Sequence, residues 1–222
     1  MPAKEAFDIK QAIGLLRKKV AELPKAALFD LYDRGYTSLF EQLIACVISI
    51  RTYDEVTVPT AIRLFEKAQT AGEMVKLSAA DIDSAISDCT FHEGKARQML
   101  QISQTVVEEY GGAVPCDFDT LISFKGVGPK CANLALGIAC HQMRIGVDIH
   151  VHRITNRWGY VQAKAPEKTM QALKAKLPES YHVEINRLLV PFGKHICTGR
   201  SPHCSTCPLL NMCGQVGVSS HR

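Results

Sequence analysis

The amino-acid sequence predicts an all-α protein, and three observations support this fold class. Apolar residues recur at steps of three and four positions through most of the 222-residue chain, as on the buried face of amphipathic helices. Alternating polar and apolar runs, which are typical of strands, are nearly absent. Short connectors such as Gly111-Gly112 separate the helical stretches, and the chain has no low-complexity linker or obvious internal repeat.

The predicted helices follow one another from the N-terminus to the cysteine-rich end. The first is the amphipathic stretch Ile9–Val20, which ends before Pro24. The same spacing predicts further helices at residues 38–50, 54–67, 80–87, 94–110, 118–124, 130–140, 150–158, 165–177 and 181–195. Pro59 lies inside one of these and predicts a kink or a restart there, because proline removes a backbone hydrogen bond.

Composition limits the classes of protein to consider. With 46% hydrophobic residues the chain can bury a substantial core, as one large or two small domains. No apolar run approaches the length of a membrane span. The formal charge of +4 permits contact with a polyanion but falls short of a strongly basic nucleic-acid domain. The N-terminus lacks the apolar core of a secretory signal, so we expect a cytoplasmic protein, associated with the nucleoid if the source is bacterial.

Four cysteines near the C-terminus are the most informative local pattern. Cys197, Cys204, Cys207 and Cys213 are separated by six, two and five residues. Four thiolates in one loop can hold a [4Fe-4S] cluster, which needs one thiolate for each iron. Structural zinc remains an alternative, although zinc commonly uses two tight cysteine pairs and this segment has one. Disulfides would require an oxidising compartment.

The other five cysteines are scattered, mostly among apolar residues. They are Cys46, Cys89, Cys116, Cys131 and Cys140. The odd total of nine favours reduced core thiols over a framework of disulfides.

A second informative segment predicts a helix-hairpin-helix. A short helix leads into Gly126-Val127-Gly128, whose glycines tolerate tight turns, and Pro129 suits the first position of a new helix. Free backbone amides at such a turn can bind a phosphate without base contacts. The two glycines alone would favour an ordinary turn between helices.

Three segments together resemble the endonuclease III family of helix-hairpin-helix DNA glycosylases. Residues 121–136 resemble the family's hairpin, residues 147–153 resemble its catalytic Val-Asp-x-His segment, and the terminal cysteines match its cluster spacing. The similarity extends weakly upstream, through residues 43–54 and 90–96, and so covers most of residues 38–213.

The resemblance implies a fold and a mode of binding. It implies a six-helix domain at residues 32–143, with the hairpin at about 117–140, and a discontinuous cluster domain made of residues 1–31 and 144–222. The DNA would lie in a cleft between the two domains, with a damaged pyrimidine rotated out of the duplex because its glycosidic carbon is inaccessible inside the stack. The implied partner is duplex DNA with damaged bases or abasic sites, and we expect a monomer.

The resemblance also assigns catalytic roles. By motif position Lys130 is the nucleophile, whose amine would expel the base and form a Schiff base that permits β-elimination. Asp148 would stabilise positive charge on the sugar and assist proton transfers. Taken without the resemblance, Lys130 would be a solvated cation or a phosphate contact, and Asp148 would be a helix cap. His150 is expected to be structural or to contact DNA.

Two residues depart from the family pattern. Arg51 stands where many members have a glutamine that fills the space left by the flipped base, and Phe91 stands where a leucine wedge is usual. Arg51 offers several donors and Phe91 can insert between base steps, so we expect both to contact DNA and to alter the substrate range. In the cluster loop, Arg200 is expected to contact the DNA backbone, with Lys194 and His195 just before it.

Three functions are consistent with these residues. The first is a bifunctional glycosylase and abasic-site lyase acting on oxidised pyrimidines, which Lys130 and Asp148 favour. The second is a monofunctional mismatch glycosylase, although that branch usually lacks the hairpin lysine. The third is a specialised, weakly active paralogue that acts mainly as an abasic-site lyase or a DNA-structure binder, which Arg51 and Phe91 make worth testing.

Overall fold

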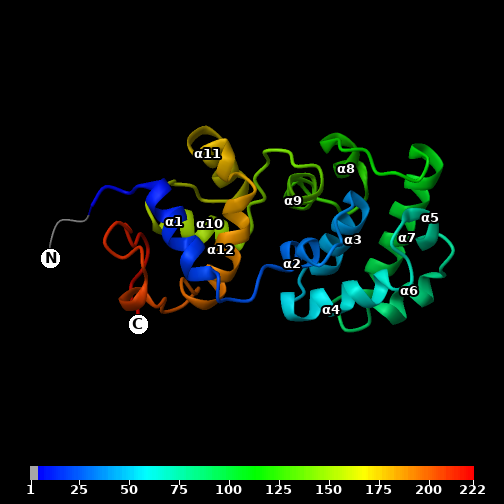
Figure 1. Ribbon diagram of the computed structural model, residues 1–222, viewed down its shortest axis with the longest axis horizontal. Helices are drawn as coiled ribbons and strands as arrows, with labels where there is room; N and C mark the ends of the chain where they lie inside the picture. The colour runs from blue at the N-terminus through cyan, green and yellow to red at the C-terminus, as the bar shows by residue number, and fades with distance from the viewer. Residues whose placement is uncertain (1–4) are drawn as a thin grey trace. The chain divides into compact units, whose positions relative to one another are not determined.

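A computed structural model describes residues 5–222, so residues 1–4 of the N-terminal segment lie outside the description. Across residues 5–222 the chain forms helices, turns and loops and no strand, which confirms the all-α prediction. None of the helices in this range is long and apolar enough to cross a membrane. The chain divides into two compact units, and Figure 1 shows their helices. Unit 1 comprises Met1–Ala26 and Met143–Arg222, and unit 2 comprises Ala27–Gln142.

Unit 2 contains eight helical segments, some of them very short. They are α2 (Ala27–Asp33), α3 (Leu39–Ser49), α4 (Asp54–Phe65), α5 (Ala71–Met74), α6 (Ala79–Ala85), α7 (His92–Tyr110), α8 (Phe118–Ser123) and α9 (Pro129–Ala139). The sequence spacing did not predict α2 and α5, because both are too short to display a helical repeat. The helix does not restart at Pro59, since α4 continues through it.

Helix α3 is the centre of the unit 2 core. All of its residues from Leu39 to Ile48 are buried, and α2, α4, α7 and α9 pack around it. A helix that is apolar on every side belongs in the interior, where each face can remove apolar surface from water. A capping box fixes its start, because the Ser38 hydroxyl accepts from the Glu41 amide while Glu41 accepts from the Ser38 amide.

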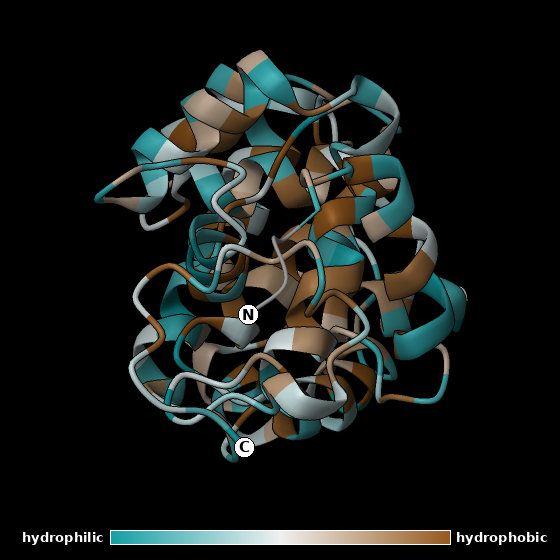
Figure 2. Cartoon of the chain, turned by 90° about the vertical axis from the view of Figure 1, so that its left-hand side faces the viewer, coloured by the Kyte–Doolittle hydropathy of each residue, from teal (hydrophilic) through white to brown (hydrophobic). Residues whose placement is uncertain are grey.

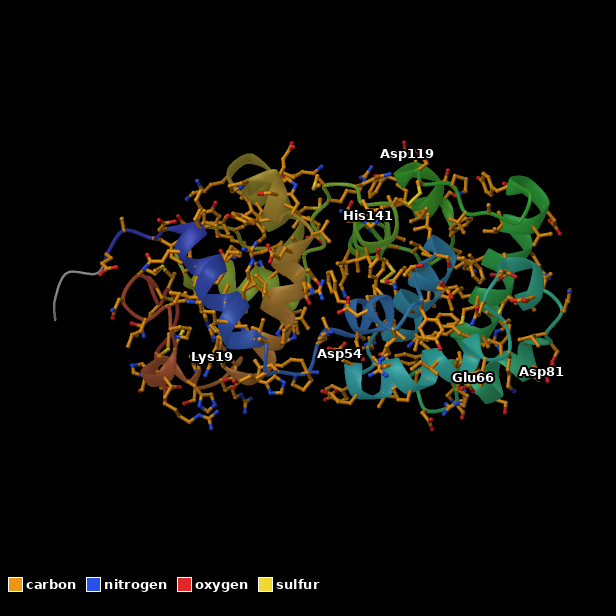
Figure 3. The ribbon with its side chains drawn as sticks, in the orientation of Figure 1. Lys19, Asp54, Glu66, Asp81, Asp119 and His141 are labelled. Carbon is orange, nitrogen blue, oxygen red and sulfur yellow. A yellow bond between two sulfur atoms is a disulfide. The ribbon has the colours of Figure 1, made fainter. Side chains whose placement is uncertain are left out.

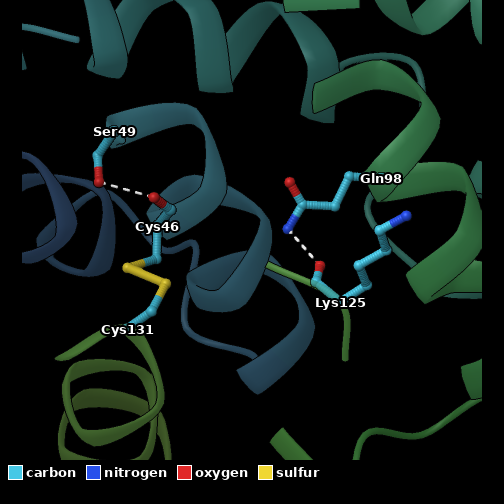
Figure 4. Close-up of a disulfide and its surroundings, with 5 residues drawn as sticks. All are labelled: Cys46, Ser49, Gln98, Lys125 and Cys131. Atoms are coloured by element: carbon cyan, nitrogen blue, oxygen red, sulfur yellow. Dashed lines mark hydrogen bonds between the residues drawn. A yellow bond between two sulfur atoms is a disulfide. The ribbon is translucent and has the colours of Figure 1, made fainter. Parts of the chain in front are cut away.

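The cysteines of unit 2 correct the prediction of reduced thiols. Cys46 on α3 is bonded to Cys131 on α9, as Figure 4 shows. A second disulfide joins Cys116, just before α8, to Cys140 at the end of α9. The Cα atoms are 5.9 Å and 6.1 Å apart, within the range that a disulfide can bridge. Helix packing brings together cysteines that are distant in sequence, and only Cys89 of the five scattered cysteines is a free, buried thiol.

Unit 1 packs the N-terminal helix against helices from the C-terminal third. Its helical segments are α1 (Ile9–Val20), α10 (Ile149–Arg157), α11 (Pro166–Lys176), η1 (Glu179–Tyr181), α12 (Glu184–His195) and η2 (Cys204–Thr206). Their apolar faces form one core that includes Leu16, Trp158 and Phe192. Figure 2 shows this unit with brown and teal residues on the same helices, as expected for elements that bury one face.

Charged side chains of unit 2 lie on its surface. Glu66, Asp81 and Asp119 are exposed and point outward in Figure 3. Asp81 also closes the capping box of α6 with Ser78, and these hydrogen bonds lower the pKa of the Asp81 carboxyl. The surface acids therefore serve mainly to solvate the unit and to start its helices.

Candidate active site and cluster site

The predicted hairpin is present in unit 2. Helix α8 ends before Phe124, and the chain turns through Gly126, at φ +82°, and Gly128 before α9 begins at Pro129. The buried side chain of Val127 anchors the turn, and its amide donates to the Phe124 carbonyl at 3.0 Å. Because a left-handed residue is needed at the tip, glycine at position 126 avoids backbone strain.

A side chain from α7 forms a hydrogen bond with the hairpin. Gln98 Nε2 donates to the Lys125 carbonyl at 2.8 Å, a bond drawn in Figure 4. A Cβ atom at position 126 would lie 2.7 Å from the same Gln98 nitrogen. Glycine therefore suits the backbone angle at this position, and a larger residue would also displace the Gln98 amide from its bond to Lys125.

Lys130 is the second residue of α9 and its side chain is exposed. The first amides of a helix have no partners inside it, so the start of α9 presents donors beside this lysine. The next residue, Cys131, is buried and bonded to Cys46 on α3. The lysine thus stands on a helix end that is held firmly in the core of unit 2.

Asp148 lies in unit 1, at the N-cap of α10. Its Oδ1 accepts from the amides of His150 at 2.9 Å and Val151 at 2.8 Å. The carboxylate is half-buried and held in one orientation by these two bonds. The capping role and a chemical role are compatible, because the two amide bonds use Oδ1 alone and fix the orientation of the carboxylate.

His150 belongs to the contact between α10 and α12. Its Nδ1 lies 3.2 Å from Arg153 Nη2, and Arg153 also donates to the carbonyls of Gly193 and Cys197 at 2.9 Å each. A Cβ atom on Gly193 would lie 2.5 Å from His150 Nδ1. The close packing of α10 on α12 therefore depends on glycine at position 193.

The four C-terminal cysteines line one pocket of unit 1. Cys204 is buried and the other three are half-buried, and the pocket wall is completed by Trp158, Phe192 and Ile196 among others. Regular structure in this loop is limited to η2, so a few loop hydrogen bonds fix it, such as Cys213 N to Leu209 O at 2.8 Å. Four soft thiol donors around a mostly apolar pocket fit a [4Fe-4S] cluster.

Among residues 5–222, no three metal-binding side chains come close enough to hold a single metal ion.

Nitrogen donors lie close to two of the cysteine sulfur atoms. Arg157 Nη1 lies 3.4 Å from Cys197 Sγ and donates to the Thr198 carbonyl at 2.6 Å. The amide of Gln215 donates to Cys213 Sγ at 3.4 Å. The pKa of the Cys207 thiol is raised to about 11, because burial and the three neighbouring cysteines outweigh a backbone hydrogen bond from Leu209 that lowers it.

Arg51 and Phe91 meet on the surface of unit 2. The guanidinium carbon of Arg51 lies 5.4 Å from the centre of the Phe91 ring, within reach of a cation–π interaction. Both residues are exposed, and both have left-handed backbones, at φ 56° and φ 60°. Arg200, by contrast, lies in unit 1 on the exposed part of the cluster loop, where its carbonyl accepts from the Thr198 hydroxyl at 2.8 Å.

Comparison with known proteins identifies the family. Residues 44–179 match the HhH-GPD superfamily of base excision DNA repair proteins. Endonuclease III of Thermotoga maritima is 40% identical over 177 residues, which is 80% of this chain and 83% of that protein. The chain belongs to the endonuclease III family. Another relative, endonuclease III-like protein 1 of Gallus gallus, is 34% identical over 78% of this chain, which spans 63% of that protein.

A solved structure of endonuclease III in a non-covalent complex with DNA is also similar to this family member. The two share 26% sequence identity with a TM-score of 0.81, covering 93% of this chain and 94% of the other. The predicted fold and the predicted enzyme class, a DNA N-glycosylase and abasic-site lyase, are confirmed by this membership. The chain is a base excision repair enzyme.

Several residues at the sites of this family member were not predicted from its sequence. They are Lys95, Gln98, Arg153, Arg157 and Gly193. Each acts on a segment far along the chain, so a local motif gives no sign of its partner. Only Lys95 carries a signal, because it precedes Met99 and Ile102 at steps of four and three on the buried face of α7.

Proposed function

We propose that this enzyme removes oxidised pyrimidines from duplex DNA and then cleaves the abasic site by β-elimination through a lysine Schiff base. The observation that carries the proposal is the position of Lys130, exposed in the first turn of the hairpin's second helix in an endonuclease III family member. A lysine at that point is the nucleophile that a bifunctional glycosylase requires.

Lys130 would carry the covalent steps. Its unprotonated Nζ forms a bond to the sugar C1′ while the bond from C1′ to the base breaks, and the base leaves with a proton. Opening of the sugar ring gives the Schiff base. Loss of a C2′ proton then expels the 3′ phosphate, which breaks the strand. The sequence of steps moves protons and electron pairs within the substrate and needs no oxidant.

Asp148 would stabilise positive charge on the sugar and transfer protons. As the sugar develops positive charge, an ionised carboxylate nearby lowers the barrier, and the same group can accept and return a proton during elimination. The two amide bonds to Oδ1 support this role because they fix the carboxylate before substrate arrives.

DNA binding would combine backbone and side-chain contacts. The amides around Gly126 and Gly128 suit a phosphate, with no dependence on base sequence. The Arg51 and Phe91 pair would enter the base stack beside the flipped nucleotide. His150 and Arg200, both in unit 1, would add contacts to the backbone. The partner is duplex DNA with a damaged base or an abasic site, bound by a monomer in the cytoplasm.

A [4Fe-4S] cluster would be held by Cys197, Cys204, Cys207 and Cys213. When bound it supplies iron–thiolate bonds that fix the loop, and base excision by the route above moves no electrons through it. Arg157, which already bonds the carbonyls of Thr198 and Gly199 and faces Cys197 Sγ, would offset negative charge on the ligands.

Borohydride trapping tests the lyase chemistry. Reduction on a duplex with an abasic site should leave the wild-type protein covalently attached, and Lys130→Ala should abolish the adduct. Lys125→Ala is the matched control, since it removes an exposed lysine five residues earlier on the same hairpin and should keep trapping. An adduct that survives in Lys130→Ala would disprove the assigned nucleophile.

Release assays test the substrate class. Duplexes bearing thymine glycol, dihydrouracil, uracil or a plain abasic site should be processed in single turnover, with the two oxidised or saturated bases well above uracil. Weak release of every base with intact strand cleavage at the abasic site would instead support the specialised paralogue, for which Arg51 and Phe91 are the motivating departures.

A further inference from the structure

Lys95 is a buried lysine in unit 2 that the proposed chemistry does not use. It lies in the first turns of α7 and is 5% exposed. A lysine is almost never this buried unless its ammonium group is bound. Burial lowers the pKa of Lys95, and the neighbouring Cys89 opposes that shift. The groups that bind its ammonium group explain how this burial is tolerated.

Three hydrogen bonds from Lys95 converge on one loop. Its Nζ donates to the carbonyls of Ile48 at 2.7 Å and Ile50 at 2.8 Å and to the Thr52 hydroxyl at 3.1 Å. These acceptors use the three donors of an ammonium group. The carbonyls belong to the C-terminal end of α3, where a cation is favoured by the helix dipole. Lys95 therefore holds the chain on both sides of Arg51.

The same loop is tied to the segment that carries Phe91. The amide of Thr90 donates to the Thr52 hydroxyl at 3.3 Å, so the hydroxyl links the two segments. Arg51 and Phe91 each have a positive φ, which is unfavourable for a residue with a side chain. Such backbones persist only where the surroundings determine them.

We propose that Lys95 is a positioning residue that preforms the Arg51 and Phe91 pair for entry into the base stack. The three bonds hold the loop in its left-handed turn, and Arg51 is thereby presented over the Phe91 ring before DNA arrives. DNA binding then does not have to order the loop, which lowers the free-energy cost of opening the duplex. The inference rests on the proposed function, because that function assigns the pair to the base stack.

The first test separates duplex opening from chemistry. Lys95→Met keeps an unbranched chain in the core and removes the donors. For an abasic site in a paired duplex we expect kcat/KM to fall about 10- to 100-fold, as misplaced groups commonly cost. Trapping on an abasic site inside an unpaired bubble should change less than about twofold, because that substrate needs no opening. Equal losses on both substrates would show a merely structural role and overturn the proposal.

A second variant covers the case in which Lys95→Met fails to fold. Thr52→Val removes the hydroxyl that accepts from Lys95 and Thr90, on a half-exposed residue, and leaves the core lysine in place. We expect a smaller loss of the same kind, confined to the paired duplex. Fluorescence of 2-aminopurine opposite the lesion should rise less on binding than with the wild type. An unchanged rise in both variants would contradict the proposal.

An assay without DNA distinguishes this inference from the proposed function. Trypsin cleaves after arginine. Arg51 is exposed, but its loop is held in a left-handed turn by the hydrogen bonds from Lys95. Cleavage at Arg51 should accelerate about tenfold in Lys95→Met and less in Thr52→Val, with melting temperatures measured for both. If the wild type forms no borohydride-trapped adduct, the proposed function fails. The trypsin assay would still test whether Lys95 orders the loop. Unchanged cleavage would show that Lys95 does not order it.

Discussion

The hairpin of unit 2 and the cysteine loop of unit 1 are stabilised in different ways. The hairpin joins two helices, has a buried valine at its tip, and is fixed by the Gln98 bond and by the disulfide from Cys131 to α3. The cysteine loop has one short 3-10 turn and surrounds a pocket lined by four thiols. The hairpin is therefore held by bonds within the protein, whereas the cysteine loop has few such bonds and borders a pocket.

The largest expected effect comes from removing one of the proposed cluster ligands. Cys204→Ser should yield protein with little iron and no visible absorbance, because a cube that loses one of four thiolates is weakly held. Metal binding is coupled to folding of its loop, so residues 197–222 should become sensitive to proteases while the hairpin stays resistant. Iron content and mapped proteolysis measure the two effects.

Cys89→Ala is the control for that experiment. Cys89 is the free, buried thiol of unit 2, and its loss should leave the iron content unchanged. If Cys204→Ser retained iron, or if both variants lost it, the assignment of the four ligands would be wrong. If the hairpin became protease-sensitive together with the loop, the contrast between the two regions would not hold.

The next effect separates binding from chemistry at Asp148. Asp148→Asn keeps an acceptor oxygen for the amides of His150 and Val151, so the cap of α10 should survive. The charge is lost, and base release should fall roughly 100- to 10,000-fold in single turnover, with DNA affinity nearly unchanged. A helix that melts, seen by circular dichroism, or release within threefold of the wild type would each argue against the role given to this carboxylate.

A smaller effect probes the hairpin itself. Gly126→Ala places a Cβ 2.7 Å from Gln98 Nε2 on a backbone at φ +82°, and we expect about 1–2 kcal/mol of lost stability together with weaker DNA binding. Gly112→Ala is the control, since Gly112 has φ +90° and nothing within 4 Å of the added carbon. It should lower the melting temperature without changing DNA affinity. If both variants bound DNA equally well, the hairpin would not be part of the DNA-binding surface.

Local patterns in the sequence predicted more of the hairpin and the cysteine loop than of the groups that support them. The glycines at 126 and 128 and the spacing of the cysteines are local patterns, so they can be recognised in the sequence without a structure. The disulfides were predicted wrongly because their partners are 85 and 24 residues apart, and thiol pairing depends on helix packing. Lys95 bonds carbonyls up to 47 residues away, and a contact of that kind leaves no local motif.

The smallest expected effect concerns which base lies opposite the lesion. Arg51 is exposed, lies over the Phe91 ring, and presents a fork of donors that matches the O6 and N7 acceptors of guanine. We therefore expect a preference for guanine over adenine opposite an abasic site. Arg51→Gln should reduce the ratio of kcat/KM values about fivefold, at the lower end of the discrimination that such pairs give. Arg97→Gln, which changes an exposed arginine on α7, should leave the ratio unaltered. A ratio that does not move in Arg51→Gln would mean that this side chain fills space without reading the base, and the Arg51 and Phe91 pair would then act as a wedge alone.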